Sequence, residues 1–194
     1  MTEENRFALL VSLACHDLRT PLATIFGFAR TLARSDDLGE PATGYLRMVE
    51  ASAQQLAELL DDLSVAARIE AGRYDPQLTE AETGSLAQFV AEQLGPERVT
   101  AAGDGATVRV DRPATERAVV ALTQCALRHG GLDHVTVTAE GAELTIAPIT
   151  PASAPVVLGE DLRDLGAAVA GSVIEALGGS VELEDETLRV RLAG

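Results

Sequence analysis

Lysine is absent from this 194-residue sequence, in which all 15 basic residues are arginine. The absence excludes mechanisms that need a lysine amine: a Schiff base, a P-loop lysine or a lysine general base. Tryptophan is also absent and aromatic residues make up 3% of the chain, so the core has to be built from Ala, Leu and Val. Because 46% of the residues are hydrophobic, there is enough apolar material for one large domain or two small ones.

Cysteine and long apolar runs are scarce as well. Cys15 and Cys125 are the 2 cysteines of the chain, too few for a disulfide framework or a cysteine-based zinc cluster. Each is expected to be a buried thiol in a reducing compartment. No apolar run approaches the roughly 20 residues of a membrane span, and the acidic N-terminus is unlike a signal peptide. We therefore expect a soluble, cytoplasmic protein.

Negative charge dominates the composition. The chain carries 30 acidic residues against 15 basic ones, which gives a formal net charge of −15. A chain this acidic repels phosphate backbones and anionic lipids. We therefore expect neither nucleic acid nor a membrane among its partners.

Residues 1–72 carry two heptad patterns, which predict two long helices. The apolar positions step by three and four residues: Val11, Ala14, Leu18, Pro21, Ile25, Phe28 and Leu32 in the first helix, and Ala42, Leu46, Val49, Ala53, Leu56, Leu60, Leu63 and Ala67 in the second. A turn-forming cluster at 35–41 separates them, so they should form an antiparallel hairpin. One hairpin cannot cover two such wide apolar faces, and we expect a homodimer joined as a four-helix bundle.

The rest of the chain has a different pattern. Residues 73–83 are polar and predict a linker, whereas residues 84–194 alternate between helical and strand-like segments. Strands are predicted over 107–110, 134–138 and 143–146, the last two as a hairpin, and a helix is predicted over 161–177. This interleaving predicts a sheet with helices on one face. The predicted fold class is therefore α+β, with a dimerising helical hairpin followed by an α/β sandwich.

His16 is distinguished by its heptad position. With Val11 at position a, His16 falls at f, opposite the seam and in solvent. The same side of the helix carries Leu9, Leu13, Thr20, Ala23 and Gly27. A docking surface for a partner helix around a reactive imidazole explains these outward leucines and small residues, and it explains a helical glycine that costs about 1 kcal/mol relative to alanine. Helix geometry alone leaves one alternative equally open, a solvated surface histidine without a role.

Phosphoryl transfer suits this arrangement. A neutral imidazole keeps one ring nitrogen unprotonated and nucleophilic. Asp17 is placed to orient the ring or to take its proton. Thr20, one turn further on, could hydrogen-bond a phosphoryl oxygen or a water molecule, and Pro21 tends to bend the helix just below the site.

The segment His16-Asp17-Leu18-Arg19-Thr20-Pro21-Leu22 resembles the H-box of bacterial two-component histidine kinases. Residues 59–64 and 68–72 resemble the end of that family's second dimerisation helix. The resemblance implies a dimerisation and histidine-phosphotransfer domain over 1–72, with His16 as the phosphorylated residue. It implies that Asp17 assists phosphorylation and that Thr20 supports dephosphorylation of a partner. The partner-binding surface would consist of Leu9, Leu13, Arg19, Ala23 and Gly27.

Residues 84–194 resemble the ATP-binding (GHKL, Bergerat-type) module of the same family, but only in the segments that form its fold. Ala121 and Cys125 stand where the family has two asparagines, one of which holds Mg²⁺. Residues 147–151 lack the expected Asp-x-Gly-x-Gly box. A thiol is a poor ligand for Mg²⁺, which prefers oxygen. The resemblance therefore implies a degenerate nucleotide site, with no cofactor and no metal in this chain.

Taken together, the resemblance implies a dimeric histidine phosphotransfer protein similar to the ChpT-type phosphotransferases. It would pass a phosphoryl group, without using ATP, between His16 and an aspartate of a response-regulator receiver domain, which would carry the Mg²⁺. An upstream kinase or phosphorelay donor is a further expected partner. Two alternatives stay open: a sensor kinase core with a divergent ATP site, and a non-catalytic scaffold or phosphatase for a regulator.

Three further residues, His129, His134 and Asp61, have side chains that can bind a metal. His129 and His134 are five residues apart, but the sequence shows no third metal ligand beside them. His129 fits better as a cation at a helix C-terminus. Asp61, in the second predicted helix, is interpreted as a solvated acidic residue.

Overall fold

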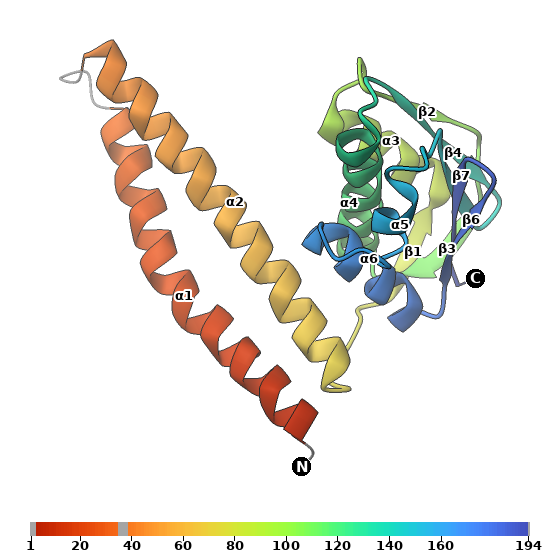
Figure 1. Ribbon diagram of the computed structural model, residues 1–194, viewed down its shortest axis with the longest axis horizontal. Helices are drawn as coiled ribbons and strands as arrows, with labels where there is room; N and C mark the ends of the chain where they lie inside the picture. Colours follow the sequence, from red (N-terminus) through yellow and green to blue (C-terminus); the bar gives the residue numbers. More distant parts are fainter. Residues whose placement is uncertain (1–2, 35–38, 194) are drawn as a thin grey trace. The chain divides into compact units, whose positions relative to one another are not determined.

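The computed structural model describes residues 3–34 and 39–193, without the side chains of residues 3–10, 12–14, 17, 33 and 41. The chain divides into two compact units, Met1–Arg73 and Tyr74–Gly194. In Figure 1 the first is the helical hairpin drawn in red to yellow, and the second is the mixed unit drawn in green to blue. Each unit is described by itself below.

The first unit is an antiparallel pair of helices, α1 (Glu3–Ala33) and α2 (Glu40–Glu70). Helix α1 continues through Pro21, so the loss of one backbone donor does not end it. Helix α2 begins with a proline in its first turn and ends before Gly72, whose φ of +63° is left-handed. The hairpin matches the heptad prediction, while the turn predicted around 35–38 lies outside the described residues.

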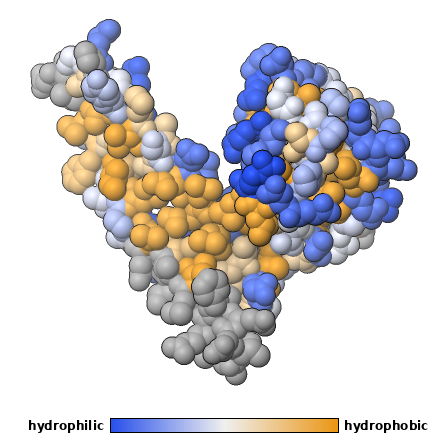
Figure 2. Space-filling view, in the orientation of Figure 1, coloured by the Kyte–Doolittle hydropathy of each residue, from blue (hydrophilic) through white to orange (hydrophobic). Residues whose placement is uncertain are grey.

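The interior of the hairpin uses small side chains. The buried residues of α1 include Cys15, Leu22 and Ala29, which are seven residues apart, and α2 adds Ala53. The predicted seam of α1 lies mostly outside this interior. The neighbouring row of Cys15, Leu22 and Ala29 packs against α2 instead, because two of its three side chains are small. The seam residues Leu18, Ile25, Phe28 and Leu32 are exposed at 52%, 52%, 67% and 47%. Figure 2 shows the resulting apolar surface along the hairpin.

The second unit contains two sheets. A five-stranded sheet has the order β2-β4-β5-β7-β6, with β2 and β4 parallel and the other neighbours antiparallel. Strands β1 and β3 form a separate antiparallel pair. The strand bounds are Thr79–Glu82 (β1), Val99–Ala102 (β2), Thr107–Val110 (β3), Val135–Glu140 (β4), Glu143–Ala147 (β5), Ser180–Glu184 (β6) and Thr187–Arg191 (β7).

Helices cover one side of the larger sheet, as Figure 1 shows. They are α3 (Thr83–Leu94), α4 (Arg112–Gly130), the short α5 (Ala154–Val157) and α6 (Leu165–Ala176). The core between the layers contains fully buried leucines and isoleucines, among them Leu86, Leu122, Leu144, Ile146 and Ile174. The predicted α+β class, a helical hairpin followed by a sheet-based domain, is confirmed.

Three local predictions differ from the structure. The expected linker over 73–83 contains strand β1, which pairs with β3 in an antiparallel register. The polar sequence of β1 does not predict this strand, because it is the backbone that forms the pairing. Strand β2 was not predicted. The helix expected from Asp161 begins at Leu165, because the Asp164 side chain accepts a hydrogen bond from the Ala167 amide and caps it there. Among the described helices, none is both long and apolar enough to cross a membrane.

Candidate functional site

His16 lies on α1 with its side chain exposed to solvent, as its heptad position predicts. Thr20, one helical turn further on, is exposed as well, and so are Ala23 and Gly27. A Cβ atom added at Gly27 would meet nothing within 4 Å, so this part of α1 presents an open, low-relief surface. The side chains of Leu9, Leu13 and Asp17 lie outside the described residues, and their roles stay predictions.

Arg19, predicted to contact a partner, is engaged within the hairpin. Its guanidinium group donates to Asp61 Oδ1 of α2, from Nη2 at 2.6 Å and from Nε at 3.1 Å. Both side chains are about half exposed, so the pair is expected to contribute at most about 1 kcal/mol to folding. It ties α1 to α2 one turn away from His16. Asp61 is therefore half exposed, as interpreted from the sequence, and it is also part of an inter-helix ion pair.

A groove with a volume of about 320 Å³ runs beside this ion pair, between α1 and α2. It is lined by Arg19, Leu22, Ala23 and Phe26 of α1 and by Ala53, Gln54, Ala57 and Asp61 of α2. Ala23 thus belongs to a hollow rather than to a convex face. The contribution of α2 was missed at the sequence level, although the small residues Ala53 and Ala57 were a visible signal for close approach.

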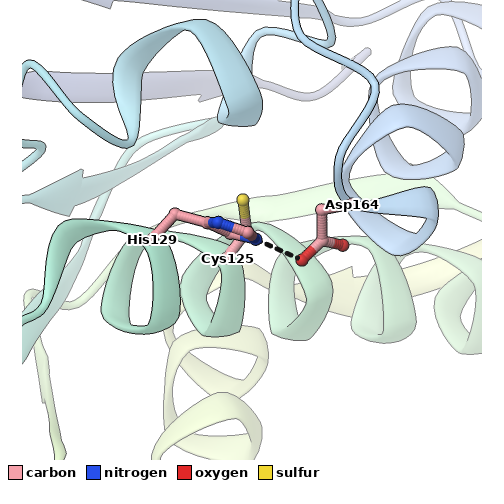
Figure 3. A group of neighbouring side chains, drawn as sticks. All are labelled: Cys125, His129 and Asp164. Carbon is pink, nitrogen blue, oxygen red and sulfur yellow. Dashed lines mark hydrogen bonds and ion pairs between the residues drawn. The ribbon is translucent and has the colours of Figure 1, made fainter.

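A second cluster lies in the unit that follows, where Cys125, His129 and Asp164 come together (Figure 3). Cys125 and His129 are one turn apart on α4, and Asp164 is the residue that caps α6. His129 Nε2 lies 3.2 Å from Asp164 Oδ2, and Arg128 Nη1 contacts the same oxygen at 3.2 Å. The spacing of Cys125 and His129 is apparent in the sequence, but Asp164 joins them only through the fold.

The Cys125 thiol is fully buried. Burial, followed by the charge of Asp164, raises the pKa of Cys125 to about 12, although Arg128 and Arg163 oppose the shift. A buried, protonated thiol does not fit the Mg²⁺ that the family resemblance assigns to this position, because Mg²⁺ takes oxygen ligands in octahedral geometry. We therefore derive no chemical step through Mg²⁺-ATP in this chain.

The state of this thiol gives a testable prediction. In a Cys15→Ala variant, Cys125 is the remaining cysteine, and about one molecule in ten thousand carries its thiolate at pH 8. We expect alkylation by iodoacetamide to be slower by at least about a hundredfold in the native protein than in urea. Mass spectrometry of timed samples measures this ratio. Equal labelling rates in the two states would contradict the buried, protonated thiol.

Comparison with known proteins adds the family of the first unit. Residues 8–72 match the family described as the His Kinase A (phospho-acceptor) domain. The sensor protein DivL of Caulobacter vibrioides is 35% identical over 71 residues, which is 37% of this chain and 9% of DivL. The chain thus spans about a tenth of the length of this curated relative.

Solved structures share the fold of 61–93% of the chain. Full-length ShkA in complex with AMPPNP has a TM-score of 0.69 at 20% identity, over 93% of this chain and 44% of ShkA. The histidine kinase AdeS of Acinetobacter baumannii has a TM-score of 0.58 at 18% identity, over 92% of this chain and 97% of that structure. The ATP-binding domain of PrrB from Mycobacterium tuberculosis has a TM-score of 0.51 at 20% identity, over 61% of this chain and 98% of that domain.

The two kinds of comparison agree with the division of the chain into a hairpin that carries His16 and a sheet-based unit. The chain therefore has the architecture of a histidine kinase core, in which residues 8–72 match the His kinase A phospho-acceptor domain and the following unit has the fold of the ATP-binding domain.

Proposed function

We propose that this chain is a histidine phosphotransfer protein of a cytoplasmic two-component phosphorelay. It passes a phosphoryl group between His16 and an aspartate of a response-regulator receiver domain, and it does not use ATP. The observation that supports this proposal most is the exposed His16 within a phospho-acceptor domain. The buried thiol at Cys125, in a unit that has the ATP-binding fold, supports the absence of an ATP-dependent step.

The transfer needs an exposed nucleophile more than it needs a catalytic pocket. The unprotonated ring nitrogen of His16 attacks the phosphorus atom, a P–N bond forms, and the P–O bond to the regulator aspartate breaks. The aspartate leaves as a carboxylate, while the other ring nitrogen keeps its proton. The receiver domain is expected to bring the Mg²⁺ that neutralises charge on the phosphoryl group, so positioning is the main task of this chain.

The residues around His16 take roles in that positioning. Asp17 orients the imidazole ring or holds its proton. The regulator's helix lies along Ala23 and Gly27 and enters the groove between α1 and α2, where small side chains leave room for it. An upstream kinase or relay donor would use the same surface, because the reaction at His16 is the same in both directions.

A homodimer completes the first unit in this proposal. Large apolar side chains line one flank of each hairpin: Leu18, Ile25, Phe28 and Leu32 of α1 and Val49, Leu56 and Leu63 of α2. A second hairpin that packs on this flank removes them from water in a four-helix bundle. His16 is at a different heptad position, so the dimer leaves it accessible.

Thr20 favours a second activity, dephosphorylation of the regulator. Its hydroxyl group is exposed one turn after His16, where it can hydrogen-bond a water molecule near the phosphoryl group. Replacing Thr20 by Ala should then lower phosphatase activity while leaving acceptance of phosphate by His16 intact.

The absence of an ATP step can be tested by calorimetry. We expect titration of the full chain with a non-hydrolysable ATP analogue and Mg²⁺ to show no binding, because Cys125 offers a buried thiol instead of an oxygen ligand. The ATP-binding domain of PrrB in the same buffer is the positive control. A micromolar Kd would favour the alternative, a kinase core with a divergent ATP site.

A further inference from the structure

We propose that Cys125, His129 and Asp164 form a zinc-binding site, which does not depend on phosphotransfer at His16. The site lies between α4 and α6, two helices that pack against each other in the second unit. It takes a borderline-soft divalent cation in place of the Mg²⁺ associated with this fold. It also revises the expectation from the sequence that the chain holds no metal.

The positions of the three ligand atoms carry the proposal. The Cys125 Sγ atom, a ring nitrogen of His129 and a carboxylate oxygen of Asp164 all lie within 4.8 Å of one another. Around one tetrahedral zinc ion, with bonds of about 2.0–2.3 Å, ligand atoms are about 3.3–3.8 Å apart. His129 Nε2 and Asp164 Oδ2, at 3.2 Å, are already at that separation. The Sγ atom lies within 4.8 Å of both, so completing the site requires a shift of about 1 Å on binding.

Two helices hold the ligands from opposite sides (Figure 3). Residues four apart project from the same face of a helix, so α4 directs the thiol and the imidazole together. Asp164 is held from behind, because its Oδ1 accepts a hydrogen bond from the Ala167 amide at 3.1 Å. A hydrogen bond of this kind orients a carboxylate for its metal, and here it turns the second oxygen toward His129 and Arg128.

The donor set selects the metal. Thiolate, imidazole and carboxylate together suit zinc, whereas Mg²⁺ and Ca²⁺ require oxygen ligands. On binding, the S–H bond of Cys125 breaks, a Zn–S bond forms and the proton passes to water. The thiolate and the carboxylate then balance the two charges of the ion. Three protein ligands leave the fourth position for a water molecule, as in open zinc sites.

Of the two arginines whose charges oppose the cation, Arg128 lies against a ligand atom. Its guanidinium contacts Asp164 Oδ2 at 3.2 Å, but its side chain is 56% exposed and can turn into solvent when the ion enters. The Arg163 side chain is paired with Asp161 at 2.7 Å. Both arginines therefore have another place for their charge, Arg128 in solvent and Arg163 beside Asp161, when the ion binds.

Cobalt(II) is the probe, because it replaces zinc and its bond to a thiolate gives a charge-transfer absorption band in the near ultraviolet. The full chain is first treated with EDTA under reducing conditions and then titrated with Co²⁺ alone. We expect the band to saturate at one Co²⁺ per chain and to disappear on addition of Zn²⁺. We also expect Zn²⁺ to raise the melting temperature of the chain, because it joins α4 to α6.

Two variants and two controls make the test specific. Cys125→Ala should abolish the band. Asp164→Asn keeps the helix cap, since asparagine caps helices well, and should weaken Co²⁺ binding at least about tenfold. Cys15→Ala and His134→Ala should behave as the wild type, because Cys15 belongs to α1 and the His134 ring contacts Thr100 at 3.0 Å.

Each possible result of the cobalt titration either supports or overturns the proposed site. The absence of a sulfur-to-cobalt band in the wild type would overturn the proposal, as would a band that survives Cys125→Ala. If Cys125→Ala proves unfolded by circular dichroism, Asp164→Asn decides: unchanged Co²⁺ affinity in this folded variant would overturn the site, and a tenfold loss would support it. None of these results depends on whether His16 is phosphorylated.

Discussion

Replacing His16 by Ala should abolish phosphoryl acceptance, with no phosphorylated chain detectable by autoradiography. Regulator binding should change by less than about twofold, because the imidazole is a small part of a contact that extends along α1 and into the groove. Transfer assays and calorimetry with the same receiver domain measure the two effects separately. Acceptance of phosphate by the His16→Ala variant would assign the nucleophile to another residue.

Ala23→Arg should weaken regulator binding while leaving the nucleophile His16 intact, the opposite pattern to His16→Ala. The nucleophile stays in place, but a long cation fills the groove where Ala23 lies beside Gln54 and Ala57. We expect weaker regulator binding and transfer slowed by at least about tenfold, since misplacement of the reacting groups costs rate steeply. Ala51→Arg is the matched control, because Ala51 is exposed on α2 and does not line the groove. Transfer at the wild-type rate in Ala23→Arg would place the docking surface elsewhere.

Replacing Leu18 and Leu56 together by Glu should give monomeric or unfolded protein. Both side chains are 52% exposed in the single hairpin, and the proposed dimer buries them. Full burial of a leucine contributes about 1.5–3 kcal/mol, and each of these is already about half buried, so four such residues per dimer account for about 3–6 kcal/mol before the cost of burying a carboxylate is added. Light scattering after gel filtration gives the mass, and circular dichroism gives the folded fraction.

The control for that pair is Gln55→Glu, which adds one negative charge at an exposed position of α2 beside the apolar flank. We expect it to remain dimeric. A wild-type chain that is folded and monomeric at micromolar concentration would refute the dimer, and so would a dimer that tolerates both glutamates.

The heptad pattern was sufficient to predict both long helices, but it did not identify which row would pack within the hairpin. Leu18 and Cys15 belong to neighbouring rows, and hydrophobicity alone favours the row of larger residues. The structure buries the row with Cys15 and Ala29 because small side chains allow α1 and α2 to approach closely. The larger residues are left exposed on the single hairpin, which is the surface that the proposed dimer would cover.

Strand prediction in the second unit succeeded where side chains alternate and failed where they do not. Residues 107–110 and the hairpin at 135–147 alternate between buried and less buried positions, and both were predicted. Strand β1 has the sequence Thr-Glu-Ala-Glu, which has no apolar β-branched residue, and its pairing with β3 supplies the order that its composition lacks.

The contacts near His16 and those in the cluster around His129 differ in whether the sequence alone can predict them. His16 and Thr20 could be placed together because helical spacing is local. Arg19 and Asp61 are 42 residues apart, and His129 and Asp164 are 35 apart, so their contacts depend on how whole elements pack. Charge and spacing indicate which residues are able to pair, but only the fold selects the partner.

Transfer of phosphate from a receiver domain is the most direct test of the proposed function. Receiver domains labelled with a small-molecule phosphodonor are freed of donor and incubated with the full chain in the absence of ATP. We expect acid-labile phosphate to appear on the wild-type chain, to be absent from His16→Ala, and to return to a fresh receiver domain. If no receiver domain donates phosphate to His16, while labelled ATP phosphorylates the chain directly, the phosphotransferase proposal is wrong and the protein is a kinase.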